Sequence, residues 1–342
     1  MIELDYTVSF NTPAFLGNAE QSAQWRTPPF KALLRQWWRV AWAAEQGFRV
    51  RVEEMRAAEA ALFGSAADDS RGESGHSKVR IRLSTWQQGA MTRWEGLPQV
   101  RHPEVNFPVG SDLYLGFGPL KLENRMLGFK GNAAIQSGES AKLSLAYLPN
   151  PQLDRALGLL QLYGTLGGRS RNGWGSFTLK PGANNPTSTA VAVPLRPWRD
   201  CFDRDWAHAI GSDERGALVW QTAECSDWKA VLTLLAKIKI GLRTQFKFPH
   251  AQPDGQVHDR HWLSYPVTKH SVHAWVKNTR LPNSLRFKVR AVGNGRCVGV
   301  VFHVPHLPPS AFLPDKAQVQ TVWKKVHVFL DTPAAALTRI DA

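Results

Sequence analysis

The sequence has few cysteines and no long apolar run. Its three cysteines, Cys201, Cys225 and Cys297, are far apart and form no C-x-x-C pair, which argues against a disulfide framework and a zinc finger. No apolar stretch approaches the ~20 residues that a membrane-spanning helix needs. Residues 1–6 lack the basic start and apolar core of a secretory signal. We therefore expect a cytoplasmic protein without membrane contact.

Several signatures of catalysis are also missing. The chain has no G-x-x-x-x-G-K-[ST] loop, no H-E-x-x-H helix and no G-x-S-x-G elbow. Nucleotide hydrolysis, zinc proteolysis and esterase chemistry therefore have no support in the sequence. We expect no cofactor, no metal and no enzymatic activity.

Acidic residues are scarce relative to basic ones. The 42 lysines and arginines against 28 carboxylates give a formal net charge of +14. A surface of that charge attracts polyanions, although a basic protein can also simply be kept soluble by its charge. Fourteen tryptophans are many for 342 residues. Most should lie in the core, and others could stack on unpaired bases or anchor a partner protein.

Hydrophobic periodicity in the first half alternates between strands and helices. The order is strand, helix, strand, strand, helix, strand, which is the split βαβ arrangement of a ferredoxin-like (RRM-like) domain. Such a domain has an antiparallel sheet with both helices on one face and the other face open to a ligand. The expected elements are strands at 2–10, 78–85, 141–147 and 176–180, helices at 29–45 and 151–163, and a long insertion at 86–138 with a strand near 113–117.

The second half repeats this pattern more faintly. Asp227 is a candidate N-cap of a helix, and two strands flank Gly293-Asn294-Gly295, a strong hairpin signal. In the first of these strands Arg286, Lys288 and Arg290 alternate with apolar residues, which predicts a basic strand face. We expect an α+β fold with two ferredoxin-like domains and long insertions. The predicted domains are residues 1–181 and 198–342, joined by a Pro/Gly-rich linker at 182–197.

A glycine-rich loop carrying arginines connects the second helix to the last strand of the first domain. Glycines let a backbone take positive φ and bring its N–H groups close to a ligand, and arginine forks suit phosphate oxygens. The loop therefore predicts a polyanion cradle, and the alternative is a tight helix-to-strand turn whose arginines face water. Its candidate site residues are Gly167, Gly168, Arg169, Ser170, Arg171, Gly173 and Trp174.

The first predicted helix has a basic stripe. Lys31, Arg35 and Arg39 are spaced by four residues and share one face, with Trp38 beside them. In a basic protein, aromatics next to such a stripe favour nucleic-acid contact, although solvated basic faces are ordinary on helices. Trp38 and Trp174 are candidate stacking planes, and either could instead belong to the core.

Two further segments carry charge. Residues 64–77 are small, polar and charged, which is typical of a flexible surface loop, and Asp68 and Asp69 within it are better explained as solvated than as metal ligands. The strand that follows alternates Lys78, Arg80 and Arg82 with apolar residues, so it should present a basic row on the open face of the sheet.

Four segments of this chain resemble a known family. They are residues 12–17, 26–39, 62–65 and 166–176, and together they resemble the RAMP superfamily of CRISPR effector proteins, most closely the first-numbered Cmr subunit of type III-B complexes. The segments cover most of the first half, and weaker similarity lies mainly at 285–306. One departure is Asn172, where a second basic residue after Arg171 is expected. This departure predicts weaker phosphate contact at that point.

The resemblance implies a subunit of a multisubunit, RNA-guided ribonucleoprotein that acts in antiviral defense. It implies that the subunit lies where the 3′ region of the guide meets the target RNA, and that it binds RNA without cutting it. The implied partners are guide CRISPR RNA, target RNA and other RAMP subunits.

Two other functions remain open from the residues. Some RAMP relatives are metal-independent endoribonucleases that use a histidine. In this chain His258 and His261, in a cluster with His250, His270 and His273, would be the residues for processing guide RNA or cleaving target. Their H-x-x-H spacing suits a metal only in a helix, and the neighbouring prolines and Gly255 argue against one. The third function is a structural adaptor that holds neighbours through its tryptophans.

Overall fold

The chain divides into two compact units. A computed structural model describes residues 1–65, 75–124, 126–185, 191–250 and 254–342. Unit 1 comprises residues 1–95, 116–194 and 288–291, and unit 2 comprises 96–115, 195–287 and 292–342. This division differs from the expected boundaries, because residues 96–115 group with unit 2 and residues 288–291 with unit 1. The expectation of an α+β fold with antiparallel sheets is confirmed, apart from one parallel pair of short strands at residues 195–197 and 210–213.

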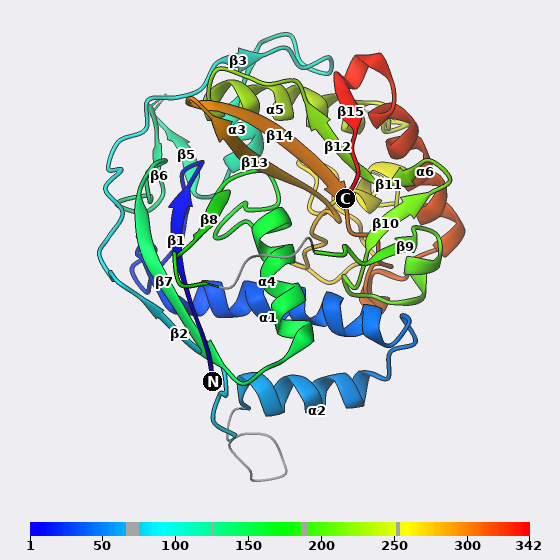
Figure 1. The fold of residues 1–342 in the computed structure, drawn as a ribbon. Helices are drawn as coiled ribbons and strands as arrows, with labels where there is room; N and C mark the ends of the chain where they lie inside the picture. Colours follow the sequence, from blue (N-terminus) through cyan, green and yellow to red (C-terminus); the bar gives the residue numbers. More distant parts are fainter. Residues whose placement is uncertain (66–74, 125, 186–190, 251–253) are drawn as a thin grey trace. The chain divides into compact units, whose positions relative to one another are not determined.

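Unit 1 is built on a four-stranded antiparallel sheet of order β2-β7-β1-β8. Helices α1 and α4 pack against each other and lie on one face of this sheet (Figure 1). The strands and helices are β1 (Ile2–Phe10), α1 (Thr27–Glu45), α2 (Val52–Phe63), β2 (Arg80–Leu83), β7 (Ser140–Tyr147), α4 (Pro151–Tyr163) and β8 (Phe177–Pro181).

Local sequence explains these elements. In β1 the alternation buries Leu4, Val8 and Phe10, which are at most 8% exposed, and turns the intervening polar residues outward. The α4 helix begins at Pro151, and the Asn150 side chain accepts a hydrogen bond from the backbone N–H of Leu153. The predicted bounds of β1, α1 and α4 are therefore confirmed to within two residues.

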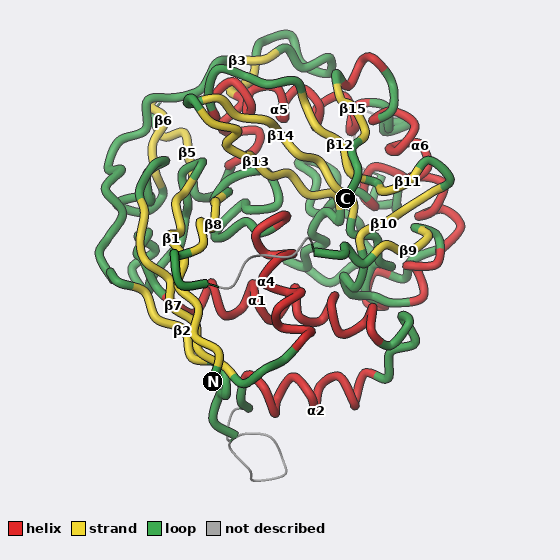
Figure 2. The backbone as a smooth tube through the Cα atoms, in the orientation of Figure 1, coloured by secondary structure: helices red, strands yellow, loops and turns green. Residues whose placement is uncertain are grey.

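The connection between β2 and β7 is mostly loop (Figure 2). Its regular pieces in unit 1 are the hairpin strands β5 (Leu120–Glu123) and β6 (Met126–Phe129). The strand predicted near 113–117 is wrong, because residues 111–116 form the short helix α3 (Ser111–Gly116). Asp112 at its start accepts hydrogen bonds from the backbone N–H groups of Leu97 and Leu113, so a residue distant in sequence fixes this turn.

Unit 2 contains a second four-stranded sheet, of order β13-β14-β12-β15, with the same succession of strands and helices as unit 1. Its elements are β12 (Val219–Thr222), α5 (Trp228–Thr244), β13 (Leu285–Gly293), β14 (Arg296–His303), α6 (Lys316–Leu330) and β15 (Leu337–Arg339). Asp227 caps α5 as predicted, by accepting from the backbone N–H of Ala230. Smaller strands of unit 2 are β3 (Gln99–Val100), β4 (Val109–Gly110), β9 (Leu195–Pro197), β10 (Ile210–Asp213) and β11 (Gly216–Ala217).

The hairpin predicted in the second half is confirmed. Gly293, Asn294 and Gly295 all have positive φ, at 99°, 50° and 75°, and they connect β13 to β14. Glycine and asparagine tolerate this backbone conformation better than other residues, which explains why the turn forms here.

The predicted linker is ordered at its start. Gly182 donates its backbone N–H to the carbonyl of Asp5, and the side chain of Asn185 pairs with both backbone groups of Asp5. Residues 195–197 form β9. Residues 186–190 of the predicted linker, and residues 66–74 of the predicted flexible loop with Asp68 and Asp69, lie outside the described residues. Among the described residues, no helix has the length and apolar character to cross a membrane.

Candidate nucleic-acid interface

The glycine-rich loop folds together with the segment that follows β1. Gly168 donates its backbone N–H to the carbonyl of Phe15 at 2.9 Å, and Gly175 donates to Pro13 at 2.9 Å. The Thr12 hydroxyl donates to the carbonyl of Gly173 at 2.8 Å. Segments 12–17 and 166–176 thus form one structure, although the bonded residues Thr12 and Gly173 are 161 positions apart in the chain.

The glycines of this loop serve its internal packing. A Cβ at Gly175 would lie 1.8 Å from the carbonyl oxygen of Leu166, and one at Gly167 would lie 2.7 Å from that of Phe15. Both residues also have positive φ, at 62° and 91°. Glycine is therefore required at these two positions whether or not a ligand binds.

The predicted use of the loop's backbone needs correction. The N–H groups of Gly168 and Gly173 donate to carbonyls of Phe15 and Ser170, so they do not point at an anion as an open cradle requires. Ser170 likewise donates its N–H to Gly167. The loop is a tight helix-to-strand turn, and its side chains rather than its N–H groups are available to a ligand.

One arginine of the loop is exposed. Arg169 adopts a left-handed backbone with φ of 57°, and its Nε donates to the carbonyl of Phe117 at 2.6 Å. Arg171 is half-buried, and burial lowers the pKa of its guanidinium. Of the two arginines that the sequence offered for phosphate contact, Arg169 is therefore the better placed.

The exposed aromatic residue beside this arginine is Phe117, which sequence reasoning missed. Its side chain is 65% exposed, and the residue lies between the end of α3 and Gly118. Because residues 113–117 were expected to form a strand, Phe117 was not identified as an exposed loop residue. The signal that could have identified it is the run Gly116-Phe117-Gly118-Pro119, an aromatic residue between turn formers.

Trp38 and Trp174 are not exposed stacking planes, which corrects that expectation. Trp38 is 2% exposed and contacts the rings of Trp42 and Phe63, and Trp174 is 0% exposed and contacts the ring of Phe15. Most of the 14 tryptophans are buried in the same way. They stabilise the core of their own unit, as the composition led us to expect of the majority.

Two arginines of the basic stripe of α1 pair with a carboxylate that the sequence analysis did not identify. Glu59 of α2 accepts from Arg35 Nε at 2.7 Å and from Arg39 Nε and Nη2, both at 2.8 Å. Its side chain is 4% exposed, whereas the two guanidinium groups remain about 40% exposed. Burial acts to raise the pKa of Glu59, but hydrogen bonds from Arg39 and Arg35 outweigh it, and the pKa is lowered.

Lys31 completes this stripe. Burial and the charge of Arg35 lower the pKa of its ammonium group. Within the described residues, Lys31 has no ion pair to a carboxylate. The stripe therefore remains net positive, but Glu59 offsets part of its charge.

The basic face predicted for β13 is wrong. Arg286 and Lys288 are 6% and 1% exposed. Lys288 Nζ donates to the carbonyl of Gln161 at 2.7 Å, and Arg290 Nη2 donates to that of Leu162 at 2.9 Å. Both acceptors lie in the last turn of α4, whose carbonyls have no hydrogen-bond partner within the helix. Lys288 and Arg290 therefore cap a helix instead of binding a ligand.

Two histidines of the cluster in unit 2, His258 and His261, have polar contacts at their imidazole rings. His258 Nε2 lies 2.8 Å from the Asp254 carboxylate, and its ring also accepts from the backbone N–H of His261. His261 accepts from the backbone N–H of His258 through Nδ1 and faces the carbonyl of His270 through Nε2, and burial lowers its pKa to about 4. These contacts fold the turn η2 (Asp259–Trp262). Across the described ranges, no group of three or more metal-ligating side chains occurs.

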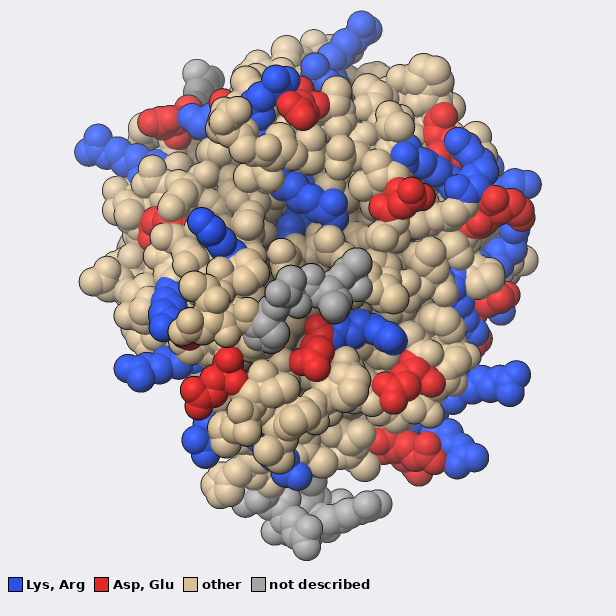
Figure 3. All heavy atoms as spheres, in the orientation of Figure 1, with Lys and Arg blue, Asp and Glu red and all other residues tan. Residues whose placement is uncertain are grey.

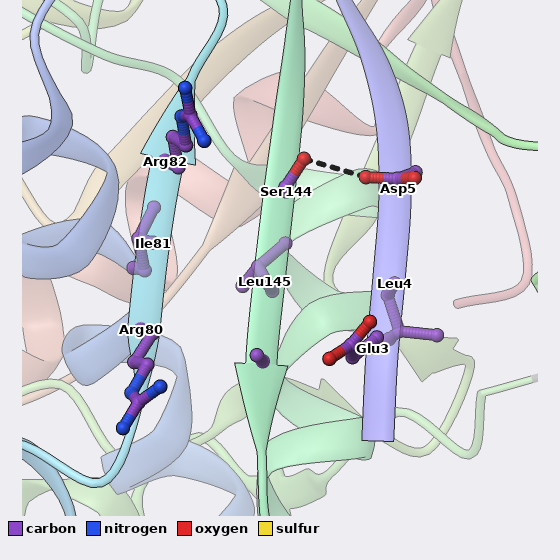
Figure 4. Close-up of a pocket in the computed structure, with 9 residues that line it drawn as sticks. Glu3, Leu4, Asp5, Arg80, Ile81, Arg82, Ser144 and Leu145 are labelled. Carbon is purple, nitrogen blue, oxygen red and sulfur yellow. Dashed lines mark hydrogen bonds between the residues drawn. The ribbon is translucent and has the colours of Figure 1, made fainter. Parts of the chain in front are cut away.

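The open face of the unit 1 sheet is hollowed (Figure 4). A cavity of about 250 Å³ is lined by Arg80 and Arg82 of β2, Ser144 of β7, and Glu3 and Asp5 of β1. Figure 4 shows the two arginines on one side of Ser144 and the two carboxylates on the other. The expected basic row on this face is therefore present at Arg80 and Arg82, both exposed. On the face of the molecule seen in Figure 3, basic and acidic side chains are interspersed.

Comparisons with known proteins gave matches in structure alone. No protein-family model and no curated protein matches the chain. Cmr1 from Pyrococcus furiosus in its apo form is similar at 14% identity and a TM-score of 0.46, covering 99% of this chain and 98% of that one. A chain of the type III-B Cmr-beta complex bound to cognate target RNA is similar at 10% identity and a TM-score of 0.47, covering 95% and 99%. A chain of a type IV-B CRISPR complex matches 56% of this chain at 14% identity and a TM-score of 0.34.

Proposed function

We propose that this protein is a non-catalytic RNA-binding subunit of a type III, Cmr-type CRISPR effector complex. Its partners in this proposal are a guide CRISPR RNA, a target RNA and other RAMP subunits. We further infer that each unit is a ferredoxin-like domain, because in both sheets the first strand lies in the middle and pairs with the third and fourth.

One observation carries the proposal. The four segments that resemble RAMP proteins come together in unit 1, although they are spread over residues 12–176. Segment 12–17 holds the loop at 166–176 through Pro13 and Phe15. Arg26 at the start of α1 donates to the carbonyl of Gly17 at 2.9 Å, and Phe63 packs on Trp38. The resemblance therefore describes a single folded structure and not scattered matches.

The exposed groups of this structure suit single-stranded RNA. Arg169 supplies a planar cation for a phosphate, and Phe117 beside it supplies an exposed ring for a base. Lys31, Arg35 and Arg39 of α1 add half-exposed cations that can contact the backbone without reading sequence. The loop helps to fix the position of Arg169, because the N–H groups of Gly168, Ser170 and Asn172 are hydrogen-bonded within this turn and to Phe15.

The endoribonuclease alternative has less support from the contacts of these histidines. A general base needs a ring nitrogen that can reach the 2′-hydroxyl, and His258 and His261 use theirs for Asp254 and for backbone groups. The contacts of both imidazoles are those of residues that stabilise a turn.

Binding of labelled single-stranded RNA to the full chain, across a salt series, tests the proposal. Arg169→Ala should weaken binding and reduce the log–log salt slope by about 0.7, the value of one phosphate contact on a single strand. Phe117→Leu should weaken binding by roughly 5-fold or more with an unchanged slope, because it removes stacking but no charge. The control Lys316→Ala removes one exposed charge of α6 in unit 2.

The same gels decide between binding and cleavage. Intact RNA with a salt-sensitive affinity that Arg169→Ala and Phe117→Leu reduce, and Lys316→Ala does not, supports the proposal. An affinity that all three variants share with the wild type shows that the loop is structural. Site-defined cut products that vanish on His258→Ala restore the nuclease.

A further inference from the structure

The hollow on the open face of the unit 1 sheet is ordered in two rows. The strand register aligns Arg80 with Ala146 and Ala146 with Glu3. The next outward row aligns Arg82 with Ser144 and Ser144 with Asp5. Each row therefore runs from an arginine over a small residue to a carboxylate, as Figure 4 shows for Arg82, Ser144 and Asp5.

The dimensions of this hollow follow from the sheet. Adjacent strands lie about 4.8 Å apart, so the arginine side and the carboxylate side are separated by roughly 10 Å across β7. Along each strand, residues two apart are about 7 Å from one another. The small side chains of Ser144 and Ala146 form the floor of this cavity, whose volume is about 250 Å³.

The two sides of the hollow differ in how their charges are engaged. Asp5 forms an ion pair with Lys142 at 2.9 Å and accepts from the Ser144 hydroxyl at 2.6 Å. The Ser144 hydrogen bond, then Lys142, lowers the pKa of Asp5. In contrast, Arg80 and Arg82 have no ion pair within the described part of the chain, and Glu3 has none either. Both arginines and Glu3 are therefore open to a ligand.

The surrounding charges favour an anionic ligand. Five cations and two carboxylates stand on this face; with Lys142 and Asp5 paired to each other, four cations and one carboxylate remain. The outward positions of the described strands carry no aromatic residue, so a ligand is held here by charge and hydrogen bonds and not by stacking. The cations are Lys78, Arg80, Arg82, Lys142 and Lys180.

We propose that this hollow is a second RNA site, in which an extended single strand lies along β2, β7 and β1. Successive phosphates contact Arg80 and Arg82, and the base edges point across Ser144 and Ala146 toward Glu3. A carboxylate accepts hydrogen bonds from exocyclic amino groups, such as N4 of cytosine, which uracil lacks. The site therefore prefers cytosine to uracil. This inference rests on the proposed RNA-binding function and adds to it a site and a base preference.

The test compares oligocytidine and oligouridine of equal length, bound to the full chain across a salt series. Arg80→Ala with Arg82→Ala should reduce the salt slope by about 1.4, the value of two phosphate contacts, and lower the affinity for both oligomers. We expect the wild type to bind oligocytidine about 5-fold more tightly than oligouridine. Glu3→Gln should reduce this preference and leave the salt slope unchanged for both oligomers. The matched control is Lys316→Ala with Lys324→Ala, which removes two exposed charges of α6.

The outcomes separate this site from the loop. If the Arg80→Ala/Arg82→Ala variant keeps the wild-type salt slope of RNA binding while Arg169→Ala weakens binding, the RNA site at the hollow is rejected. The proposed RNA-binding function then still stands. Absence of any RNA binding by the wild type overturns both. An arginine pair variant that binds RNA normally but no longer assembles with neighbouring subunits shows that the face docks protein, which also overturns the RNA site. Because Arg80, Arg82 and Glu3 are exposed, thermal unfolding of all variants should match the wild type.

Discussion

Replacing Glu59 by glutamine tests the electrostatics of the α1 stripe most directly. The carboxylate is nearly fully buried and accepts three hydrogen bonds from Arg35 and Arg39. Glu59→Gln keeps the size of the side chain, removes its charge and places an amide N–H₂ where an acceptor stood. Two like-charged guanidinium groups then lose the anion between them.

The expected loss of stability is moderate. Hydrogen bonds to charged groups contribute about 1.5–3 kcal/mol each when a partner is removed and the other is left buried. Arg35 and Arg39 are about 40% exposed and can turn toward water, so the contribution is discounted for solvent screening. We expect a net destabilisation of about 1–2 kcal/mol, which lowers the melting temperature by about 2–8 °C.

The pH dependence has a defined sign. The folded-state pKa of Glu59 is lowered from its ordinary value of 4.5. A carboxyl group with a lowered folded-state pKa stabilises the fold fully above its unfolded pKa, and this stabilisation is lost as the pH falls through the folded-state value. The difference in unfolding free energy between wild type and Glu59→Gln should therefore be constant near neutral pH and shrink below about pH 4.5.

Urea unfolding at several pH values measures this difference, and Glu54→Gln is the matched control. Glu54 lies on the same helix and pairs with Arg51, but both side chains are exposed, so its loss should cost less than about 0.5 kcal/mol. Equal stability of the two variants would refute the reasoning. If α1 contacts RNA, Glu59→Gln should also bind RNA more tightly, because the stripe gains one net positive charge.

Two further substitutions test how the loop and its surroundings are packed. Gly175→Ala should destabilise the fold by about 2–3 kcal/mol in urea unfolding, because its Cβ would lie 1.8 Å from the Leu166 carbonyl oxygen. The control Gly138→Ala has a φ of 91° but open space around it, so it should cost about 1 kcal/mol. Equal losses of stability in the two variants would contradict a packing role for Gly175. Lys288→Met removes an ammonium group whose pKa burial lowers well below 10.5. Because the unfolded chain binds that proton more tightly, wild-type stability should rise relative to Lys288→Met as the pH increases from the lowered folded-state pKa toward 10.5. Parallel pH profiles of the two proteins would show that Lys288 keeps an ordinary pKa despite its contact with Gln161.

The elements that the sequence predicted well are those specified by local signals. The helix at 151–163 has an N-cap asparagine, a proline in its first turn and a regular apolar face, and all three act within a few residues. The strand at 2–10 has a clean alternation that survives folding unchanged. Residues 113–117 carry a short apolar run that suits a strand or a helix equally, and the Asp112–Leu97 contact that decides between them spans 15 residues.

Charged residues were the least predictable, because their alternation does not reveal what faces them. Arg80 and Lys288 both belong to strands in which basic and apolar residues alternate. Arg80 faces solvent, as predicted, whereas Lys288 faces the carbonyl of Gln161, which is 127 residues away in the chain. The same holds for Arg35, whose partner Glu59 belongs to a helix that the sequence analysis did not assign. Periodicity identifies a face, but only tertiary structure supplies its partner.

The glycine-rich loop depends both on local sequence signals and on contacts made in the tertiary structure. Its glycines at 167 and 175 are explained by close contacts with Phe15 and Leu166, so their presence says nothing about a ligand. Arg169 is different, because it has a φ of 57°. At this φ a residue with a side chain destabilises the folded state by about 1 kcal/mol or more relative to glycine, so glycine would favour the turn more than arginine does. The Nε of Arg169 donates to the backbone carbonyl of Phe117, a residue that is itself 65% exposed. The proposed contact with a phosphate and a base therefore depends on an exposed arginine, in a backbone conformation that favours glycine, held against the backbone of an exposed phenylalanine.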